Sequence, residues 1–374
     1  MTRVALTIIA IFQIVLATRL VARLAATSRG RSIERSSNAF PGAVGVIVPV
    51  LDEIERLAPC LEGLIAAGPD IAKIVVVDGG SRDGTPELVR SFEKRDPRIE
   101  LIETIPCDGE NGKVHGLVTG LRELETPWVL IIDADVRPRP DLVPALLETA
   151  AKERVSILSV ATQQVLADRL DQIVHPALLT TLIYRFGIPG HATSDPQRVQ
   201  ANGQCLLIER ELLDKVGGFD PYRHVIAEDV ALARDVARLG ERVGFYESPD
   251  LISVEMYAGG RETLRNWSRS LPLVDAADAR SVRTDLASLA LLQAAPLPLL
   301  LIQPDRASLS WRVNAFLLAI RFGVLAGARR AYRNPGGWYW LAPLVDLPVV
   351  LQVLRNAGKR TFEWRGRLVV QEGE

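Results

Sequence analysis

The sequence predicts an α/β protein whose central sheet is mostly parallel, with apolar helices near both ends of the chain. Short β-branched runs alternate with amphipathic stretches from about residue 43 onward. Such alternation is typical of parallel strands joined by crossover helices. Acidic residues follow several of these runs, and a surplus of apolar residues lies near the two termini. The first pattern predicts the sheet, and the second predicts attachment to a membrane.

Four strands are predicted, at Val44–Val50, 74–77, 99–102 and Trp128–Ile132. Apolar residues at helical spacing predict helices at 54–67, 86–93, 114–124 and 230–239. Ligands of parallel sheets bind at the carboxyl ends of the strands, so the acidic turns are well placed for a site. Residues 166–188 are apolar enough for a core helix, and a membrane-facing flap is the alternative.

The N-terminal apolar run covers residues 4–18 and is broken only by Gln13 and two threonines. Four arginines follow it: Arg19, Arg23, Arg29 and Arg31. Arginines stand where a signal peptide would have its small-residue cleavage site, so an uncleaved anchor with a cytoplasmic downstream side is predicted. A signal peptide is the alternative. The run is shorter than the about 20 residues of a full span, so a tilted or interfacial helix stays open.

Three further apolar stretches follow residue 281, at 286–302, 313–328 and 338–354. Trp311, Trp338 and Trp340 stand at the starts of the last two, as in an interfacial aromatic belt. Three spans from a cytoplasmic start would place the basic tail outside, against the positive-inside rule. Because Arg321 also lies inside 313–328, that stretch is predicted to be interfacial or re-entrant. Buried helices of a soluble domain are the alternative reading.

The predicted organisation has five parts. They are a membrane anchor (1–26), a polar Ser/Arg-rich linker (27–42), a catalytic α/β domain (43–280), membrane helices (281–357) and a basic cytoplasmic tail (358–374). The localisation this implies is a multi-pass protein of the cell (inner) membrane with a cytoplasmic catalytic domain.

Composition excludes some classes of function. The chain has 44 Lys and Arg against 45 Asp and Glu, a net charge of −1, so a nucleic-acid partner bound by neutralising phosphates is not expected. Its three cysteines, Cys60, Cys107 and Cys205, are widely spaced. This spacing excludes a disulfide framework and disfavours a zinc site.

Three acidic motifs carry the candidate chemistry. Asp133 and Asp135 follow the strand Trp128–Ile132; on an extended segment they would share a face and hold a hard cation, Mg²⁺ or Mn²⁺. Asp78 follows another strand, and a turn-forming role before two glycines is its alternative. Glu228 and Asp229 begin a helix, where a capping role is the alternative.

In this order the motifs resemble the family 2 glycosyltransferases, over about residues 44–271. The segments that carry the resemblance are VPVLDEIERL, VVVDGGSRDGT, GENGKVHGLVTGL, the Asp133-Ala134-Asp135 motif, NGQCLLIERELLDKVGGFD and AEDVALARDV. The resemblance implies the GT-A fold, a Rossmann-like, mostly parallel sheet with flanking helices. The terminal apolar segments look most like the ceramide, hopanoid-associated and carotenoid branch.

The resemblance also implies roles for individual residues. Asp133 and Asp135 would bind the metal, with Asp135 as the direct ligand, and Asp229 in the Glu228-Asp229 pair would be the catalytic base. Residues implied to contact the donor nucleotide are Pro49, Asp52, Glu53, Asp78, Lys113, Asp133 and Arg269, and Gly116 would line the same pocket. The sequence departs from the family pattern at Gly79, where many members have a second Asp, and in RNWSRS, where the QxxRW motif keeps only Arg269. The second departure disfavours a chain-polymerising synthase.

The expected reaction is an inverting, metal-dependent transfer of a single sugar from a UDP-sugar to a hydroxyl of a membrane lipid. The lipid could be a carotenoid, hopanoid, sphingolipid or glycerolipid. A base opposite the leaving group needs no second nucleophile, and a tethered domain meets a lipid acceptor at high local concentration. The partners expected are thus a nucleotide-sugar donor, a membrane lipid and the lipid bilayer. Transfer to a polyprenyl phosphate carrier is the alternative, and a non-catalytic membrane scaffold is a further one.

Overall fold

The computed structural model describes residues 3–303, 305–359, 361–364 and 367–370. Contacts divide the chain into two compact units. The α/β unit comprises Gly30–Gln164, Pro189–Met256 and the two short C-terminal strands. The helical unit comprises the residues up to Arg29, Val165–Ile188 and Tyr257–Lys359.

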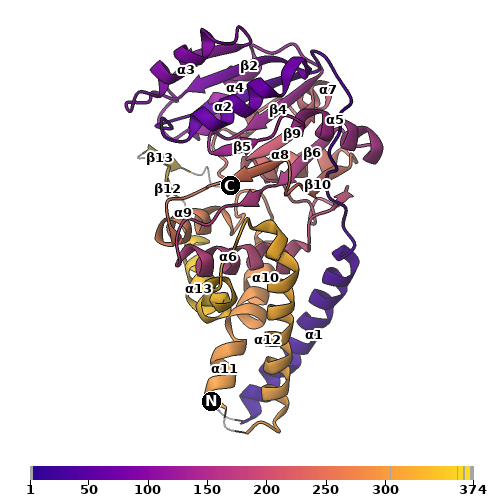
Figure 1. The fold of residues 1–374 in the computed structure, drawn as a ribbon. Coiled ribbons are helices and arrows are strands. Elements are labelled where there is room, and N and C mark those ends of the chain that lie inside the picture. Colours follow the sequence, from indigo (N-terminus) through magenta and orange to yellow (C-terminus); the bar gives the residue numbers. More distant parts are fainter. Residues whose placement is uncertain (1–2, 304, 360, 365–366, 371–374) are drawn as a thin grey trace. The chain divides into compact units, whose positions relative to one another are not determined.

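An eight-stranded sheet forms the centre of the α/β unit, in the order β3-β2-β1-β4-β9-β6-β10-β8 (Figure 1). Its strands are β1 (Val44–Val50), β2 (Ile71–Asp78), β3 (Ile99–Glu103), β4 (Trp128–Ile132), β6 (Ile157–Ala161), β8 (His191–Thr193), β9 (Cys205–Glu209) and β10 (Val243–Glu247). Strands β8 and β9 run antiparallel to their neighbours and the other neighbouring pairs are parallel. The predicted mostly parallel α/β fold is therefore confirmed.

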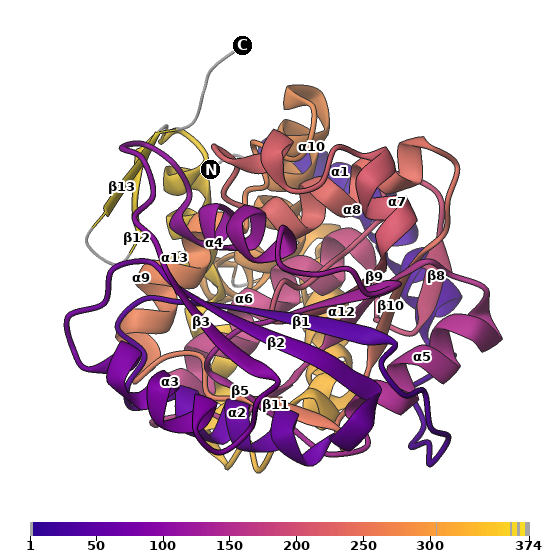
Figure 2. The ribbon, with the colours of Figure 1, turned by 90° about the horizontal axis from the view of Figure 1, so that it is seen from above.

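Helices cover both faces of the β1–β3 part of this sheet (Figure 2). On one face, α2 (Leu57–Ala66) and α3 (Thr85–Glu93) pack against side chains of β1 and β2 that include Val46 and Val76. On the other face lies α4 (Gly112–Leu121), which approaches closely because a Cβ at Gly116 would lie 3.1 Å from that of Pro49. The unit also contains α5 (Leu142–Glu153), α7 (Arg210–Lys215) and α8 (Glu228–Arg238), a small sheet of β5 (Val136–Pro138), β11 (Ile252–Val254) and β7 (Gln163–Gln164), and a hairpin of β12 (Thr361–Trp364) and β13 (Arg367–Val370).

The four predicted strands are present, and β1 and β4 have the predicted bounds. Strands β6, β9 and β10 were not predicted. Each is a five-residue run, too short for periodicity to distinguish a buried strand from a piece of buried helix. The predicted helices correspond to α2, α3, α4 and α8, with ends displaced by up to a few residues.

The helical unit contains two helices that are long and apolar enough to cross a membrane, among the described residues. They are Arg3–Thr27, which is α1, and Leu309–Ala331, most of which is α12 (Leu309–Ala328). A third candidate is the pair Ala279–Ala294 and Pro296–Ile302, which is bent by 45°. This pair comprises α10 (Ala279–Leu289), a π-helical turn (Ala290–Ala294) and α11 (Pro296–Ile302). The unit also holds α6 (Asp171–Phe186), α9 (Gly260–Ser270) and α13 (Asp346–Asn356).

Residues 313–328, predicted to be interfacial or re-entrant, form part of a helix that is long and apolar enough to cross a membrane. That stretch lies in one of the two long span candidates, whereas 338–354 is divided into a 3₁₀ segment, Trp338–Val345, and the 11-residue α13. The argument against 313–328 was the charge of Arg321, but Arg321 Nε donates to Asp346 Oδ2 at 2.7 Å and Nη2 donates to Asp346 Oδ1 at 3.1 Å. Pairing removes most of the cost of placing the guanidinium among apolar helices.

The contact units do not coincide with the predicted domain of residues 43–280. Residues 165–188 and 257–280 group with the terminal helices. Helix α6 is a buried helix, as predicted by default for 166–188, but it packs on α9 and α13 in the helical unit. Of the predicted tail, residues 361–364 and 367–370 form the β12–β13 hairpin. Residues 1–2 of the predicted anchor and 360, 365–366 and 371–374 of the tail lie outside the described residues.

Candidate active site

The centre of the candidate site is the ammonium group of Lys113. Its Nζ lies 2.9 Å from Asp133 Oδ1 and 3.1 Å from Glu228 Oε1, and it donates to the carbonyl of Gly203 at 3.2 Å. These contacts join the start of α4, the end of β4 and the start of α8. The predicted residues Lys113, Asp133 and Glu228 are therefore brought together at the carboxyl end of a central strand.

Local sequence fixes Lys113 in this position. Asn111 is the N-cap of α4, and its side chain accepts a hydrogen bond from the Lys113 backbone N–H at 3.0 Å. The Asn111 side chain also donates to the carbonyl of Val225 at 2.7 Å. This second bond ties the start of α4 to the loop that leads into Glu228. The asparagine thus caps one helix and positions the approach to another.

Asp229 lies next to Glu228 and is held by the backbone. Its Oδ2 accepts from Gly203 N at 2.6 Å and its Oδ1 accepts from Val230 N at 2.8 Å. Burial raises the pKa of Asp229, and the charge of Lys113 partly opposes this shift. Burial likewise raises the pKa of Glu228 to about 7, again opposed by Lys113. The helix start therefore carries two carboxyl groups whose ionisation is disfavoured by burial.

Burial also acts to lower the pKa of Lys113, but the charges of Asp133, Glu228 and Asp229 outweigh it and the net pKa is raised. Lys113 is thus a permanent cation surrounded by more carboxylates than it can neutralise. The site retains negative character, which a cation bound from outside would relieve.

The sequence predicted that Asp133 and Asp135 would share one face of an extended segment, but the structure does not place them on a strand. They lie in the turn between β4 and β5, where Val136 N donates to Asp133 O at 3.3 Å. The buried Oδ1 of Asp135 has no hydrogen-bond partner among the described residues. Burial, with the nearby charges of Asp133 and Glu53, raises the pKa of Asp135 to about 7.

The residues around Asp135 fit a divalent cation. A buried carboxylate oxygen without a protein partner, beside other carboxylates, is a hard oxygen ligand of the kind that Mg²⁺ and Mn²⁺ prefer. Among the described residues, no group of three or more His, Cys, Asp and Glu side chains is arranged to hold a metal alone. A cation at Asp135 would therefore need further ligands from a bound diphosphate and from water.

Asp78 has the turn-forming contacts that the sequence left as its alternative. It is 1% exposed; its Oδ2 accepts from the backbone N–H groups of Gly80 and Ser81, both at 2.9 Å, and its Oδ1 accepts from the Ser81 hydroxyl. The turn also contacts the loop after β1, because Asp52 N donates to Ser81 Oγ at 2.8 Å. A nucleoside contact by Asp78 stays a prediction.

The loop after β1 places the other predicted donor residues at the same edge of the sheet. Asp52 has a φ of +54° and accepts from Arg82 N at 2.8 Å. Glu53 is buried and pairs with Arg56 at 2.8 Å, and Pro49 lies on β1 against α4. Asp52 and Glu53 therefore lie just after β1 and Pro49 lies near its end, close to the ends of β2 and β4.

Arg269 lies in the helical unit, on α9. Its Nη2 donates to Asn266 Oδ1 at 2.8 Å, within the segment that resembles the altered QxxRW motif. Its proposed contact with a diphosphate stays a prediction.

Comparisons with known proteins bear on the domain that contains most of these residues. Residues 45–217 match the model of the family described as Glycosyl transferase family 2. The chain carries a family 2 glycosyltransferase domain. Strands β2 to β4 and β9, and β1 apart from its first residue, lie inside the matched segment with Lys113, the Asp133/Asp135 turn and Gly203, whereas Glu228 and Asp229 follow it.

Relatives of this glycosyltransferase domain include the "Probable glycosyltransferase YdaM" of Bacillus subtilis, 24% identical over 60% of this chain and 53% of its own length. The chain thus spans about half of that relative. An N-acetylglucosaminyl-diphospho-decaprenol L-rhamnosyltransferase of Mycobacterium tuberculosis is 24% identical over 58% of this chain and 78% of its own length. Among solved structures, a mannosyltransferase of Pyrobaculum calidifontis in complex with GDP-Man and Mn²⁺ is similar in fold, with a TM-score of 0.54, 20% identity and coverage of 93% of this chain and 98% of that one.

Sequence reasoning did not single out Gly203 in the glycosyltransferase domain. A Cβ at this position would lie 2.6 Å from Lys113 Nζ and 3.2 Å from Glu228 Oε1. The backbone of Gly203 also binds both Lys113 and Asp229. The signal was present as the glycine in the segment ANGQCLLIER, but only the fold brings it against Lys113.

Proposed function

We propose that the protein transfers a single sugar, with inversion, from a UDP-sugar to a hydroxyl group of a membrane lipid at the cytoplasmic face of the cell membrane. The observation that carries the proposal is the Lys113 centre, in which one ammonium group lies between Asp133 and Glu228 beside Asp229. The family 2 domain supports a nucleotide-sugar donor.

Lys113 and the carboxylates would bind and orient the donor. The positive charge of Lys113 would contact the diphosphate and stabilise the negative charge that develops as the anomeric bond breaks. Asp135, with Asp133 beside it, would hold Mg²⁺ or Mn²⁺, which when bound supplies further positive charge to the leaving group. The Mn²⁺ in the complex of the Pyrobaculum calidifontis mannosyltransferase supports this choice of metal.

Asp229 would act as the general base toward the acceptor hydroxyl. Its two backbone hydrogen bonds hold the carboxylate in one orientation, which is what a positioned base requires. Burial raises its pKa, and a more basic carboxylate is better able to take a proton near neutral pH. A base of this kind contributes about 10²–10⁴-fold to the rate.

A lipid acceptor is supported by the helical unit. Arg3–Thr27 and Leu309–Ala331 are both long and apolar enough to span a bilayer, and the arginines after residue 18 favour a cytoplasmic position for the chain that follows α1. A catalytic domain tethered in this way would meet a membrane lipid at high local concentration.

The test is nucleotide release by the detergent-purified full-length protein. A panel of UDP-sugars and GDP-sugars is supplied with Mn²⁺, Mg²⁺ or a chelator, with and without a total lipid extract. We expect release that needs one donor, the metal and the lipid, with a glycosylated lipid detected by mass. Absence of release with every donor would support a non-catalytic scaffold instead.

Transfer to a polyprenyl phosphate is a second candidate, favoured by the diphospho-decaprenol in the name of the Mycobacterium tuberculosis relative. A phosphate acceptor is already an anion and needs little help from a base. Asp229→Asn distinguishes the two reactions, because it should lower transfer to a hydroxyl by about 10²-fold or more but leave much of the transfer to a phosphate.

A further inference from the structure

Residues 338–354 of the helical unit are apolar on the side that faces away from the protein. They form the 3₁₀ segment Trp338–Val345 and most of α13. The exposed residues of this stretch, all of which the structure describes, are Trp338, Trp340, Leu341, Leu344, Leu347, Pro348 and Leu351. From 341 onward they recur every three or four residues, so they form one apolar stripe. A contiguous exposed stripe of this kind marks a surface that contacts a partner or a membrane.

The opposite side of the 338–354 segment is packed into the helical unit, against α6, α9 and α12. The Tyr339 hydroxyl donates to the carbonyl of Leu325 at 2.6 Å, and the Arg321–Asp346 pair joins the start of α13 to α12. The protein therefore holds the segment on one side, and the apolar stripe is available for contact on the other.

The segment is too short to be a span and lies near one end of a span. Helix α13 has 11 residues, or about 16 Å, against about 30 Å of hydrocarbon, and the candidate spans among the described residues do not include it. Leu325, to which Tyr339 donates, is six residues before the end of the candidate span Leu309–Ala331, or about 9 Å along the helix. Figure 1 shows α13 beside α6 and α9, away from the end of the helical unit that holds the N-terminus.

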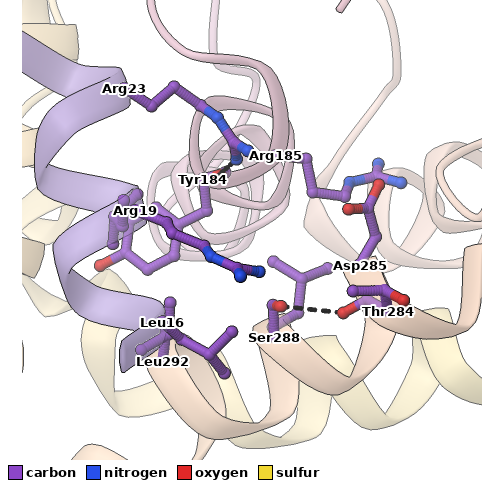
Figure 3. Close-up of a pocket in the computed structure, with 11 residues that line it drawn as sticks. Leu16, Arg19, Arg23, Tyr184, Arg185, Thr284, Asp285, Ser288 and Leu292 are labelled. Carbon is purple, nitrogen blue, oxygen red and sulfur yellow. Dashed lines mark hydrogen bonds between the residues drawn. The ribbon is translucent and has the colours of Figure 1, made fainter. Parts of the chain in front are cut away.

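The arginines of α1 mark the same level of the helical unit. Figure 3 shows Arg19 and Arg23 on α1 beside Tyr184 of α6, and Arg23 Nη1 donates to the Tyr184 carbonyl at 2.6 Å. Arginines at the end of a span lie at the depth of lipid headgroups. Helix α6 contacts both α1 and the 3₁₀ segment, so it connects these arginines to the apolar stripe.

Basic residues flank the apolar stripe on both sides. Arg329 and Arg333 precede it, Arg355 and Lys359 follow it, and all four are exposed. The only carboxylate in this stretch of the sequence is Asp346, which is paired inside the unit. Positive charge beside an apolar stripe is typical of a helix that lies on an anionic membrane surface.

We infer that residues 338–354 lie in the headgroup layer of the membrane, with the apolar stripe inserted into the leaflet in which α12 ends at Ala331. The partner of this surface is a lipid layer that contains anionic lipids. The inference rests on the membrane location in the proposed function and does not depend on sugar transfer.

This placement also fits the charge of the last part of the chain. The crossings that follow residue 279 are then the bent pair and α12. Two crossings return the chain to its starting side, so Arg355 and Lys359 lie on the cytoplasmic side, in accordance with the positive-inside rule. A further crossing at 338–354 would place them outside.

The first test measures the depth of a spin label in the full-length protein, in liposomes of phosphatidylcholine and phosphatidylglycerol. The label is attached to Leu344→Cys in a Cys107→Ser background, because Cys60 and Cys205 are buried. Leu344 is 62% exposed, so this substitution leaves the core intact. We expect a label about 5–10 Å below the phosphates, measured as accessibility to oxygen relative to a nickel chelate.

Three further labels calibrate this depth. Leu351→Cys, on the same apolar stripe, should match Leu344→Cys. Ala319→Cys, exposed near the middle of Leu309–Ala331, should be deeper, and Asp250→Cys, exposed in the α/β unit, should be in water. A Leu344 label as deep as that at 319 would indicate a span, one as accessible to the chelate as that at 250 would indicate a surface in water, and one shielded from both reagents would indicate a second copy of the chain. Each of these results would overturn the inference.

The second test compares the sides of the membrane on which single cysteines react with an impermeant maleimide. Arg306 precedes α12, Arg333 follows it and Lys359 follows α13, and all three are exposed. We expect Arg333→Cys and Lys359→Cys to react from one side and Arg306→Cys from the other. Reaction of Arg333→Cys and Lys359→Cys from opposite sides would show that 338–354 crosses the membrane and would contradict the inference.

A carbonate wash of the membranes separates this inference from the proposed function. Release of the protein by the wash would contradict the membrane location on which both rest. Retained protein with a Leu344 label in water would overturn the inference alone. Both tests are run without nucleotide-sugar, so a failure of the proposed reaction leaves their results unchanged.

Discussion

In the α/β unit one ammonium group forms ion pairs with more than one carboxylate, whereas in the helical unit one guanidinium group pairs with a single carboxylate. Lys113 lies between Asp133 and Glu228 at 2.9 and 3.1 Å, with the charge of Asp229 close by. Arg321 instead binds both oxygens of Asp346, at 2.7 and 3.1 Å, and both side chains are nearly fully buried. The first arrangement leaves negative charge unneutralised, whereas in the second the two charges balance.

The difference separates a site from a structural contact. Burial and neighbouring carboxylates raise the pKa values of these groups. A bound cation, such as a metal with the nucleotide-sugar donor, would stabilise their ionised form. The balanced Arg321–Asp346 pair joins α12 to α13, and Gln293 adds a hydrogen bond to Asp346 Oδ1 at 2.9 Å. Its charges balance, although the buried Nη1 of Arg321 has no hydrogen-bond partner among the described residues.

The largest effect is expected from Asp135→Asn. The amide removes a charge from the unbalanced side, so metal-dependent nucleotide release should fall about 10³-fold. Release is measured at saturating donor over a range of Mn²⁺ concentrations. Asp250→Asn, which changes an exposed carboxylate of the same unit, should stay near the wild-type rate. A fall of less than tenfold for Asp135→Asn would argue that the carboxylate is not part of the site.

Asp346→Asn should produce the next largest effect, on stability instead of turnover. It leaves Arg321 buried with no compensating charge, which costs about 3 kcal/mol or more of unfolding free energy. Thermal unfolding in detergent measures the loss. The double variant Arg321→Leu/Asp346→Leu should recover much of it, because it removes both charges. If the double variant is as unstable as the single one, packing rather than charge accounts for the effect.

Lys113→Met should change the pH dependence of the reaction. Burial raises the pKa of Glu228 to about 7 and that of Asp229 above its usual value, and the charge of Lys113 opposes both shifts. Without Lys113 the two carboxyl groups stay protonated to higher pH. We therefore expect the acid limb of the kcat/KM profile, which rises with pH as the base ionises, to move upward by about one pH unit.

The rate of Lys113→Met should also drop about tenfold near neutral pH and recover in part at high pH. Lys113→Arg retains the charge and is the matched control for the shift. An acid limb that stays in place in Lys113→Met would show that neither Glu228 nor Asp229 controls it.

Gly203→Ala tests how closely the backbone packs against Lys113 in the candidate active site. A methyl group at this position would lie 2.6 Å from Lys113 Nζ, so the ammonium must move away from Glu228. We expect kcat/KM to fall about fivefold, close to 1 kcal/mol of transition-state stabilisation. Gly323→Ala on α12 is the control, because a Cβ there meets nothing within 4 Å. Equal kinetics for the two variants would mean that the site tolerates the displacement.

The sequence predicted four of the eight strands of the sheet that carries the site, because β1, β4 and the second half of β2 are apolar runs followed by acidic or glycine turns. It also predicted Lys113, Asp133 and Glu228, which the fold brings within hydrogen-bonding distance. It could not predict Gly203, whose role depends on the antiparallel strand β9 that follows it. A glycine in the sequence can indicate a close approach by another group, but it does not show which side chain makes that approach.

The sequence also could not show which charged residues form ion pairs when they lie far apart in the chain. Arg321 was noted as costly among apolar residues, yet nothing in the sequence shows that it pairs with Asp346. Without knowledge of this pair, the charge of Arg321 counted against Leu309–Ala331 as a candidate span. The prediction that Asp133 and Asp135 share a strand face was also wrong, for a local reason. Strand β4 ends at Ile132, and both residues lie in the turn that follows.

Lys73→Met should have the smallest effect. Lys73 Nζ lies 2.6 Å from Glu100 Oε2, about as close as Arg321 is to Asp346, but the two side chains are 32% and 46% exposed. Water already solvates both groups, so losing the pair should change the free energy of unfolding by less than about 1 kcal/mol. Chemical denaturation of the full-length protein measures this change. If Lys73→Met were as destabilising as Asp346→Asn, separation rather than burial would decide the strength of these pairs, and the contrast between the two units would lose its physical basis.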